Sequence, residues 1–194
     1  MDKDLKVLPI ISACFGDMLG NENRLSSLSW LQEKKENTMK PKMNRKDLLD
    51  KNDIWNAVVS VVSDCDLSTK DTVLKEAFIV FQYHSELESG GHESLLTWMG
   101  SYINEVSIES YLNELIAILE KIGAHDYAEI EKNYGRKMWR LHAALENDEI
   151  DEDEFYNIVE KADDEYDKLN QGIDSLLERY FISIHADLID VVEN

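Results

Sequence analysis

The sequence has few cysteines and no long apolar run, and each shortage excludes a class of protein. Its 194 residues include only two cysteines, Cys14 and Cys65, which are too few and too far apart for a disulfide framework or a zinc site. No apolar stretch approaches the roughly 20 residues that a membrane-spanning helix needs. We therefore expect a protein without membrane spans that works in the reducing environment of the cytoplasm.

Basic residues are also scarce. Lysine and arginine number 20 against 40 aspartates and glutamates, so the formal net charge is −20. Such a charge repels nucleic acid and anionic membranes, which makes direct binding to either of them unfavourable. The composition therefore favours a basic protein as the partner.

The acidity is concentrated at the C-terminal end of the chain. Residues 1–50 carry 9 bases and 8 acids, whereas residues 144–194 carry 3 bases and 17 acids. The nearly neutral part ends in the polar stretch QEKKENTMKPKMNRK, whose composition is typical of a linker or an exposed loop. We predict a loosely attached N-terminal segment or linker at residues 1–46 and one helical domain at residues 47–194.

Apolar residues in the predicted domain recur with helical spacing, which indicates an all-α fold, a compact bundle of about six helices. The hydrophobic content of 43% is enough to bury a core. Asn52 is a predicted helix cap, and Ser107 caps a helix that ends at Gly123. Gly135 lies inside the following helix, where it predicts a bend or a close contact.

The last segment has the most regular pattern of the chain. Its apolar residues alternate spacings of four and three: Phe155, Val159, Ala162, Tyr166, Leu169, Ile173, Leu176 and Tyr180. This seam predicts a long acidic C-terminal helix. The seam fits packing within the bundle and also pairing with a second copy in a homodimer, and the pattern does not choose between them.

Residues 148–167 carry eleven acids and one base. At 100° per residue, six acids of the last helix form a ridge opposite its apolar seam: Asp153, Glu160, Asp164, Asp167, Asp174 and Glu178. One interpretation is a solvated helix face. The other is a decoy surface, whose carboxylates replace DNA phosphates in front of the arginines and lysines of a DNA-binding protein. The predicted partner-binding residues are Asp148, Glu149, Asp151, Glu152, Asp153, Glu160, Asp163, Asp164 and Asp167.

A calcium loop is a weaker interpretation of the acidic stretch NDEIDEDEFYNIV. Asp151 and Asp153 have the alternation of such a loop. The stretch lacks the glycine that a calcium loop needs for its sharp turn, and also the bidentate glutamate at the correct distance. We therefore predict no metal site there.

The stretch FQYHSELESGGHESLLTWMG, residues 81–100, gathers acids and histidines around two adjacent glycines. His84, Glu86, Glu88 and His92 could form the site of a small metal-dependent enzyme. Their spacing matches no zinc pattern, and the stretch contains neither a nucleophile elbow nor a phosphate loop. Adjacent glycines favour a turn between two helices. We therefore predict no catalytic residue, no metal and no cofactor.

The run EAFIVFQYHSELESGGHESLL, followed later by ILEKIGAHDYAEIEK, resembles the signature of the bacterial DNA-mimic protein family of the DMP-nineteen type. The resemblance covers roughly residues 52–150. It places the family-signature turn at Tyr83, Gly90, Gly91 and His92. Two departures concern this turn: Ser89 replaces the usual asparagine, and Glu93-Ser94-Leu95 replaces an aromatic-rich sequence.

The resemblance implies an all-helical and often dimeric fold without known catalysis, in which some members use acidic surfaces to engage DNA-binding proteins. With the acidity of residues 148–167, it predicts a non-enzymatic acidic binding protein, a DNA mimic that occupies the basic surface of a transcriptional regulator. Three alternatives stay open: an immunity protein against a basic nuclease toxin, a metal-dependent enzyme at His84 and His92, and a structural dimer built on the seam.

Overall fold

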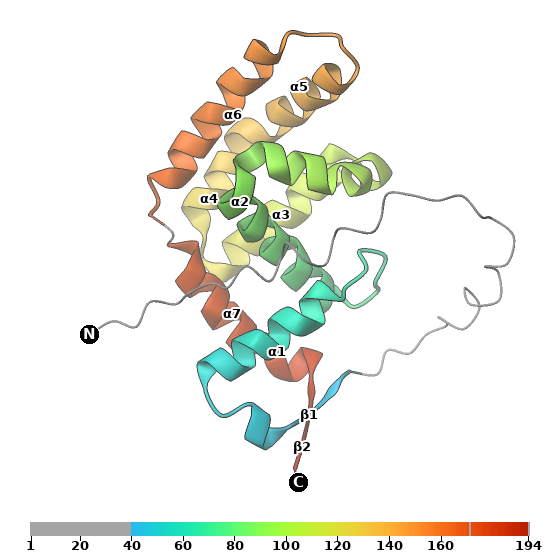
Figure 1. Cartoon of the computed structure of the whole chain (residues 1–194), viewed down its shortest axis with the longest axis vertical. Coiled ribbons are helices and arrows are strands. Elements are labelled where there is room, and N and C mark those ends of the chain that lie inside the picture. Colours follow the sequence, from blue (N-terminus) through green and yellow to red (C-terminus); the bar gives the residue numbers. More distant parts are fainter. Residues whose placement is uncertain (1–39, 171, 194) are drawn as a thin grey trace, which may run out of the picture. The chain divides into compact units, whose positions relative to one another are not determined.

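The computed structural model describes residues 40–193 apart from Gln171. Among these residues the fold is all-α, as predicted, with six helical segments when α4, η3 and α5 are counted as one. Figure 1 shows α5 and α6 side by side at one end of the bundle and α1 crossing α7 at the other. The helices are α1 (Lys51–Ser63), α2 (Thr72–Val106), α3 (Ile108–Ile122), α4 (His125–Ile130), η3 (Glu131–Gly135), α5 (Arg136–Glu146), α6 (Glu152–Asp167) and α7 (Ile173–Leu188).

A small sheet closes the end of the bundle that carries α1 and α7. Strand β1 (Lys42–Asn44) pairs in parallel with β2 (Asp190–Val192), and the 3-10 turn η2 (Arg45–Asp47) leads from β1 toward α1. Residues 40–46 thus lie in the same structural unit as the helices. The rest of the predicted N-terminal segment, residues 1–39, lies outside the described residues.

Short polar side chains define where the first helices begin. Asp50, rather than the predicted Asn52, caps α1, because its carboxylate accepts the backbone N–H groups of Asn52 and Asp53. The side chain of Asp53 accepts the N–H of Asp50 in return, which completes a capping box. Asp71 caps α2 by accepting the N–H of Leu74.

The predicted ends of α3 are confirmed. The hydroxyl of Ser107 accepts the N–H of Ser110 at 3.3 Å, and Gly123 ends the helix in the left-handed region with φ of 89°. The predicted close contact at Gly135 is also confirmed, since a Cβ there would lie 2.6 Å from Cδ2 of Leu112. Gly135 ends the π-helical turn η3, which joins α4 to α5 without a loop.

The predicted long C-terminal helix is wrong in one respect, because it is divided into α6 and α7. Asn170 has φ of 50°, which interrupts the helix between Asp167 and Ile173. Asparagine is one of the residues that most readily adopt the left-handed region at a helix end. The apolar seam is still buried within the chain, with Phe155 and Tyr166 in α6 and Ile173 in α7.

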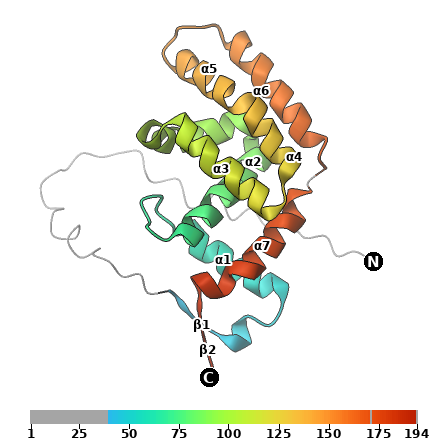
Figure 2. The same ribbon diagram turned by 180° about the vertical axis from the view of Figure 1, so that it is seen from behind.

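The core is centred on α2, which contacts α1, α3, α5, α6 and α7. Figure 2 shows from behind how α3 and the helix from α4 to α5 cover α2, while α6 lies beside α5. The most deeply buried side chains come from several of these helices and include Tyr83, Leu115, Phe155 and Phe181. Within the described residues, no helix combines the length and the apolar character that crossing a membrane requires.

Candidate functional site

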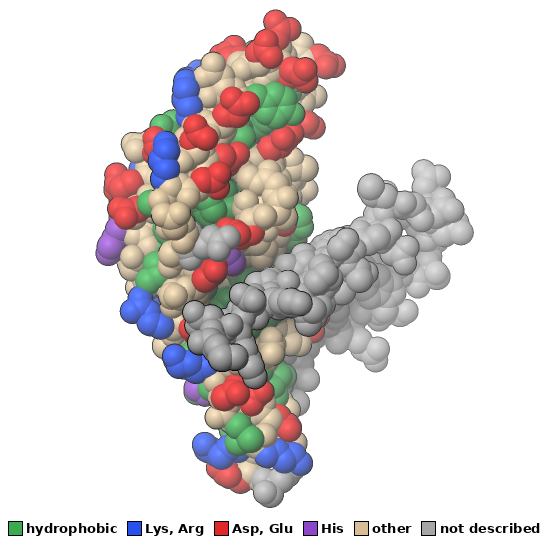
Figure 3. All heavy atoms as spheres, turned by 60° about the vertical axis from the view of Figure 1, so that its left-hand side comes forward, with side chains coloured by type: hydrophobic (Ala, Val, Ile, Leu, Met, Phe, Trp, Pro, Cys, Tyr) green, Lys and Arg blue, Asp and Glu red, His purple; other side chains and the backbone are tan. Residues whose placement is uncertain are grey.

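The acidic surface is formed by the loop between α5 and α6, residues 147–151, and by the outer face of α6. Eight of the nine predicted partner-binding residues are exposed there, and Asp163 alone is half-buried. Figure 3 shows the acidic side chains gathered over the upper end of the molecule, where this loop lies. The exposed members are Asp148, Glu149, Asp151, Glu152, Asp153, Glu160, Asp164 and Asp167.

The exposed carboxylates of the acidic surface have no cationic partner within the described part of the chain. No ion pair joins any of them to a lysine or an arginine there. The one basic residue of α6, Lys161, donates instead to the side-chain oxygen of Asn157 at 2.6 Å. The surface therefore keeps its negative charge.

Lysines and arginines instead pair with carboxylates on α2, α3 and α4. Lys75 lies 2.7 Å from Glu114, and Lys132 lies 2.7 Å from Glu120 and 2.8 Å from Glu129. Two further pairs join Lys121 to Glu76 and Arg136 to Glu109. We call these five acids, Glu76, Glu109, Glu114, Glu120 and Glu129, the paired face.

Tyrosine hydroxyls hold three carboxylates at the sides of α6. Tyr134 donates to Glu165 at 2.6 Å, Tyr156 of α6 donates to Glu93 at 3.0 Å, and Tyr166 of α6 donates to Glu88 at 3.1 Å. Burial, together with the charge of Glu88, raises the pKa of Tyr166 well above its ordinary value. A neutral phenol orients a carboxylate without cancelling its charge. These contacts fix carboxylates and leave the region anionic.

Beneath α6, the Gly90-Gly91 corner bends α2 sharply. Gly90 and Gly91 have non-helical backbone angles, and Gly91 has φ of 67°. The backbone N–H of His92 donates to Oδ1 of Asp163 at 3.0 Å, and the ring atom Nδ1 of His92 lies 2.5 Å from the same oxygen. A Cβ on Gly91 would lie only 2.6 Å from Oδ2 of Asp163. Helix α6 therefore packs against α2 at this corner.

His92 bridges two carboxylates in the interior. Its ring is fully buried, and its Nε2 lies 3.1 Å from Oε1 of Glu131, which is 2% exposed. Burial disfavours the charged imidazolium, but the hydrogen bonds and charges of Asp163 and Glu131 outweigh it and raise the pKa of His92 to about 9. At neutral pH the ring carries a positive charge and can donate from both nitrogens.

The structure does not gather all four residues of the alternative metal site, and only Glu88 among the other three acts on the charge of His84. His84 pairs with Asp174 of α7 at 3.2 Å, while Glu88 accepts from Tyr166 and His92 belongs to the cluster with Asp163. Burial lowers the pKa of His84, against the charge of Asp174. Within residues 40–193 apart from Gln171, no group of three or more His, Cys, Asp or Glu side chains is placed to hold a metal ion.

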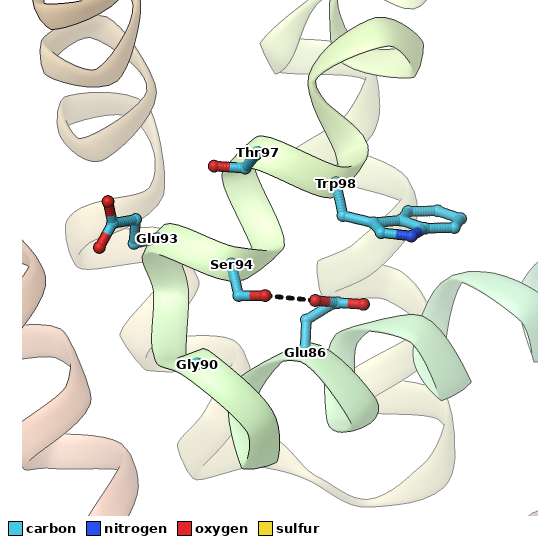
Figure 4. A pocket seen from close by; sticks show the side chains of 6 residues that line it. All are labelled: Glu86, Gly90, Glu93, Ser94, Thr97 and Trp98. Atoms are coloured by element: carbon cyan, nitrogen blue, oxygen red, sulfur yellow. Dashed lines mark hydrogen bonds between the residues drawn. The ribbon is translucent and has the colours of Figure 1, made fainter. Parts of the chain in front are cut away.

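A shallow hollow of about 340 Å³ lies in the bend of α2. Figure 4 shows Gly90 at the bend, the Trp98 indole on the following arm, and the Ser94 hydroxyl donating to the carboxylate of Glu86. Glu86 also accepts from Gln82. The hollow offers carboxylates and an aromatic ring, which are groups that attract cations. The hollow is lined by Glu86, Gly90, Glu93, Ser94, Thr97 and Trp98.

Glu131 is the residue of this region that the sequence analysis missed. It is a buried glutamate in η3, four residues after Tyr127 and seven before Met138, both of which face the core. A charged residue in phase with an apolar stripe is a signal that could have identified it. The same signal applies to Asp163, which lies four residues after Val159 and three before Tyr166 of the buried seam.

Comparison with known proteins identifies the fold family of the region that contains these residues. A family model described as DMP19-like protein matches residues 71–185, which run from the cap of α2 into α7. The resemblance predicted from the glycine corner is thereby confirmed. Neither the curated proteins nor the solved structures contain a match to this chain.

Proposed function

The chain belongs to the DMP19-like protein family, and on that premise we propose that it is a non-enzymatic DNA mimic that occupies the basic surface of a DNA-binding protein. The partner would be a transcriptional regulator, bound through the acidic surface. The proposal extends the family assignment to this chain's own carboxylates. Because surface charge varies independently of fold, the argument depends on those carboxylates.

One observation carries the proposal: the exposed carboxylates of the acidic surface lack cationic partners, although lysines and arginines pair with acids elsewhere in the described residues. Helix α6 has 16 residues, including eight acids and one lysine. Six of these acids and the lysine are exposed, so at 1.5 Å per residue a net charge of −5 is spread over about 24 Å, or about one charge per 5 Å. One DNA strand carries a phosphate about every 3.4 Å along the helix axis.

Recognition on such a surface is electrostatic. Arginine and lysine side chains that bind phosphates also bind carboxylates through charge-assisted hydrogen bonds. Tyrosines hold Glu88 and Glu93 beside α6 and Glu165 within it. Their orientations are already fixed, which lowers the entropy lost on binding. We therefore expect an affinity that falls steeply as salt concentration rises.

The first experiment is a pull-down from cell lysate at low salt with three baits. One is the wild type, one carries Asp151, Asp153, Asp164 and Asp167 changed to asparagine, and the matched control carries four changes on the paired face. The control changes are Glu76→Gln, Glu109→Gln, Glu120→Gln and Glu129→Gln. Both variants lose four negative charges, so they separate the position of the charge from its amount.

We expect the wild type and the control to retain a basic DNA-binding protein that the α6 variant loses. Fluorescence anisotropy then tests mimicry directly, because the wild type should displace a DNA probe from the captured protein and the α6 variant should not. Identical retention by all three baits would overturn the proposal, as would binding that is insensitive to ionic strength.

A further inference from the structure

Asp163 and Asp164 are neighbours in the sequence but occupy different environments in α6. Asp164 is exposed on the acidic surface, whereas Asp163 is half-buried with its carboxylate against the glycine corner. The sequence assigned both residues to the partner-binding set. Their separation in the structure suggests two roles for adjacent carboxylates of one helix.

Asp163 caps the second arm of α2, although it belongs to a different helix. After the bend at Gly91, the backbone N–H of His92 begins a new helical arm, and Asp163 accepts it at 3.0 Å. Aspartate is a favoured helix cap because its carboxylate accepts the free N–H groups of the first turn. Here the capping residue comes from α6, 71 positions later in the chain, so the cap also joins two helices.

Charged and titratable groups reach the cluster from four elements. His92 comes from α2, Asp163 from α6 and Glu131 from η3. Tyr83 of α2 and Tyr111 of α3 are buried close to Glu131, and burial followed by the charge of Glu131 raises the pKa of both phenols. Both tyrosines stay neutral, so the ring of His92 is the group of the cluster that balances the two carboxylates.

We propose that His92, Asp163 and Glu131 form a clasp that fixes α6, and with it the acidic surface, on the bend of α2. The role assigned to the surface rests on the proposed function, whereas the clasp itself does not. His92 and Asp163 are positioning residues, because they act through α6 and leave partner contact to exposed residues such as Asp164. Gly91 is part of the clasp since a side chain there would displace the Asp163 carboxylate.

The clasp requires the protonated ring. A neutral imidazole has one N–H group and one acceptor nitrogen, so it can donate to only one of its two carboxylate partners. The other carboxylate would then face a lone pair. If that carboxylate were Glu131, its charge would be buried without compensation. Loss of the His92 proton should therefore loosen the contact between α6 and α2.

The test measures the titration of His92 by NMR of its ring carbon in the wild type, in Asp163→Asn and in Asp164→Asn. The two variants make the same charge change at adjacent positions. We expect a wild-type midpoint near pH 9, a fall of about one pH unit or more in Asp163→Asn, and little change in Asp164→Asn. A wild-type midpoint near 6.5, the pKa of an unperturbed histidine, would overturn the clasp, as would equal shifts in the two variants.

Hydrogen–deuterium exchange at pH 7 then reports whether α6 is held by the clasp. We expect exchange in α6 to become about tenfold faster in Asp163→Asn, with little change in α7 and none in Asp164→Asn. Equal exchange of α6 in all three proteins would contradict the positioning role. If Asp163→Asn does not fold, His92→Gln, which keeps a neutral donor, replaces it and should show the same local effect.

Neither measurement involves a partner, so the clasp and the proposed function can fail separately. A titration and exchange pattern as expected, together with a pull-down that fails, would keep the clasp and remove the mimicry. A successful pull-down with an ordinary His92 titration would do the reverse.

Discussion

The acidic surface and the paired face contain the same kinds of side chain but arrange their charges in opposite ways. On the paired face each carboxylate lies close to a lysine or an arginine, as Glu114 does to Lys75 and Glu109 to Arg136. On the acidic surface the carboxylates of α6 face solvent without such partners in the described residues. The net charge of −20 is therefore concentrated by position as well as by composition.

The same contrast recurs between the two sides of α6. Its outer side carries unneutralised acids such as Asp164, while its inner side places Asp163 against a protonated histidine. Repulsion among the outer acids tends to destabilise the fold, and the inner contact offsets part of it. A helix that presents this much negative charge thus has a cation beneath it.

The largest expected effect comes from removing that cation. His92→Ala would leave Glu131 buried without its cationic partner, and we expect the free energy of unfolding to fall by about 4 kcal/mol. Urea denaturation at pH 7 measures this difference. His125→Ala is the control, because His125 is exposed and its removal should change stability by no more than about 0.5 kcal/mol. Equal effects of the two changes would remove the contrast between the sides of α6.

The second effect is a dependence of stability on pH. The folded pKa of His92 is about 9, above the unfolded value of about 6.5, so the ring stabilises the fold fully below pH 6.5. This contribution is lost as pH rises through 9, and the loss amounts to about 3 kcal/mol. Urea denaturation from pH 6 to pH 9 measures it.

The variant His92→Gln should show a nearly flat stability across that pH range. Measurements should stop at pH 9, because burial raises the pKa of the Cys65 thiol to about 11 in the folded protein. Above pH 9 this thiol ionises in the unfolded chain first, which adds a separate loss of stability. A wild-type stability as flat as that of the variant would mean that the ring is neutral in the folded protein.

Much of the fold was predictable because its signals are local. Ser107 and Gly123 bound α3 within a few residues of the apolar stripe that they delimit, and Gly135 interrupts a stripe in which alanine would be favoured. The break between α6 and α7 was missed because the apolar spacing continues in phase across it. Asn170 carried the correct signal.

The candidate site was predictable only on its outer side. Exposure of Asp164 follows from its position opposite the apolar seam. The contacts of His92 join residues 39 and 71 positions apart, and no helical period relates such distant residues. The adjacent glycines were visible, but their purpose depends on which side chain packs against Gly91, and tertiary structure alone decides that.

Glycine substitutions in α2 give a smaller effect, which tests the contact between Gly91 and α6. Gly91→Ala puts a side chain on a residue with left-handed backbone angles and displaces the Asp163 carboxylate. We therefore expect the free energy of unfolding to fall by about 2 kcal/mol. Gly100→Ala in the same helix meets only the Trp139 ring at 3.9 Å and should leave stability unchanged or raise it by up to about 1 kcal/mol. Thermal and urea denaturation of both variants measure the difference. A similar response at the two positions would show that Gly91 has no special contact with α6.

The smallest effect concerns salt, and it compares the two faces directly. Salt screens the repulsion among the α6 carboxylates and also weakens the ion pairs of the paired face, so the two faces act in opposite directions. Since the acids exceed the bases two to one, we expect the wild type to melt at a higher temperature in high salt.

The variant with Asp151, Asp153, Asp164 and Asp167 changed to asparagine should gain less thermal stability from salt, because repulsion among the α6 carboxylates has already been relieved. The control with Glu76, Glu109, Glu120 and Glu129 changed to glutamine should gain more, because it has lost the pairs that salt weakens. Equal salt responses in the two variants would mean that the melting temperature depends only on the total charge of the protein. The separation of its charged faces would then have no energetic consequence.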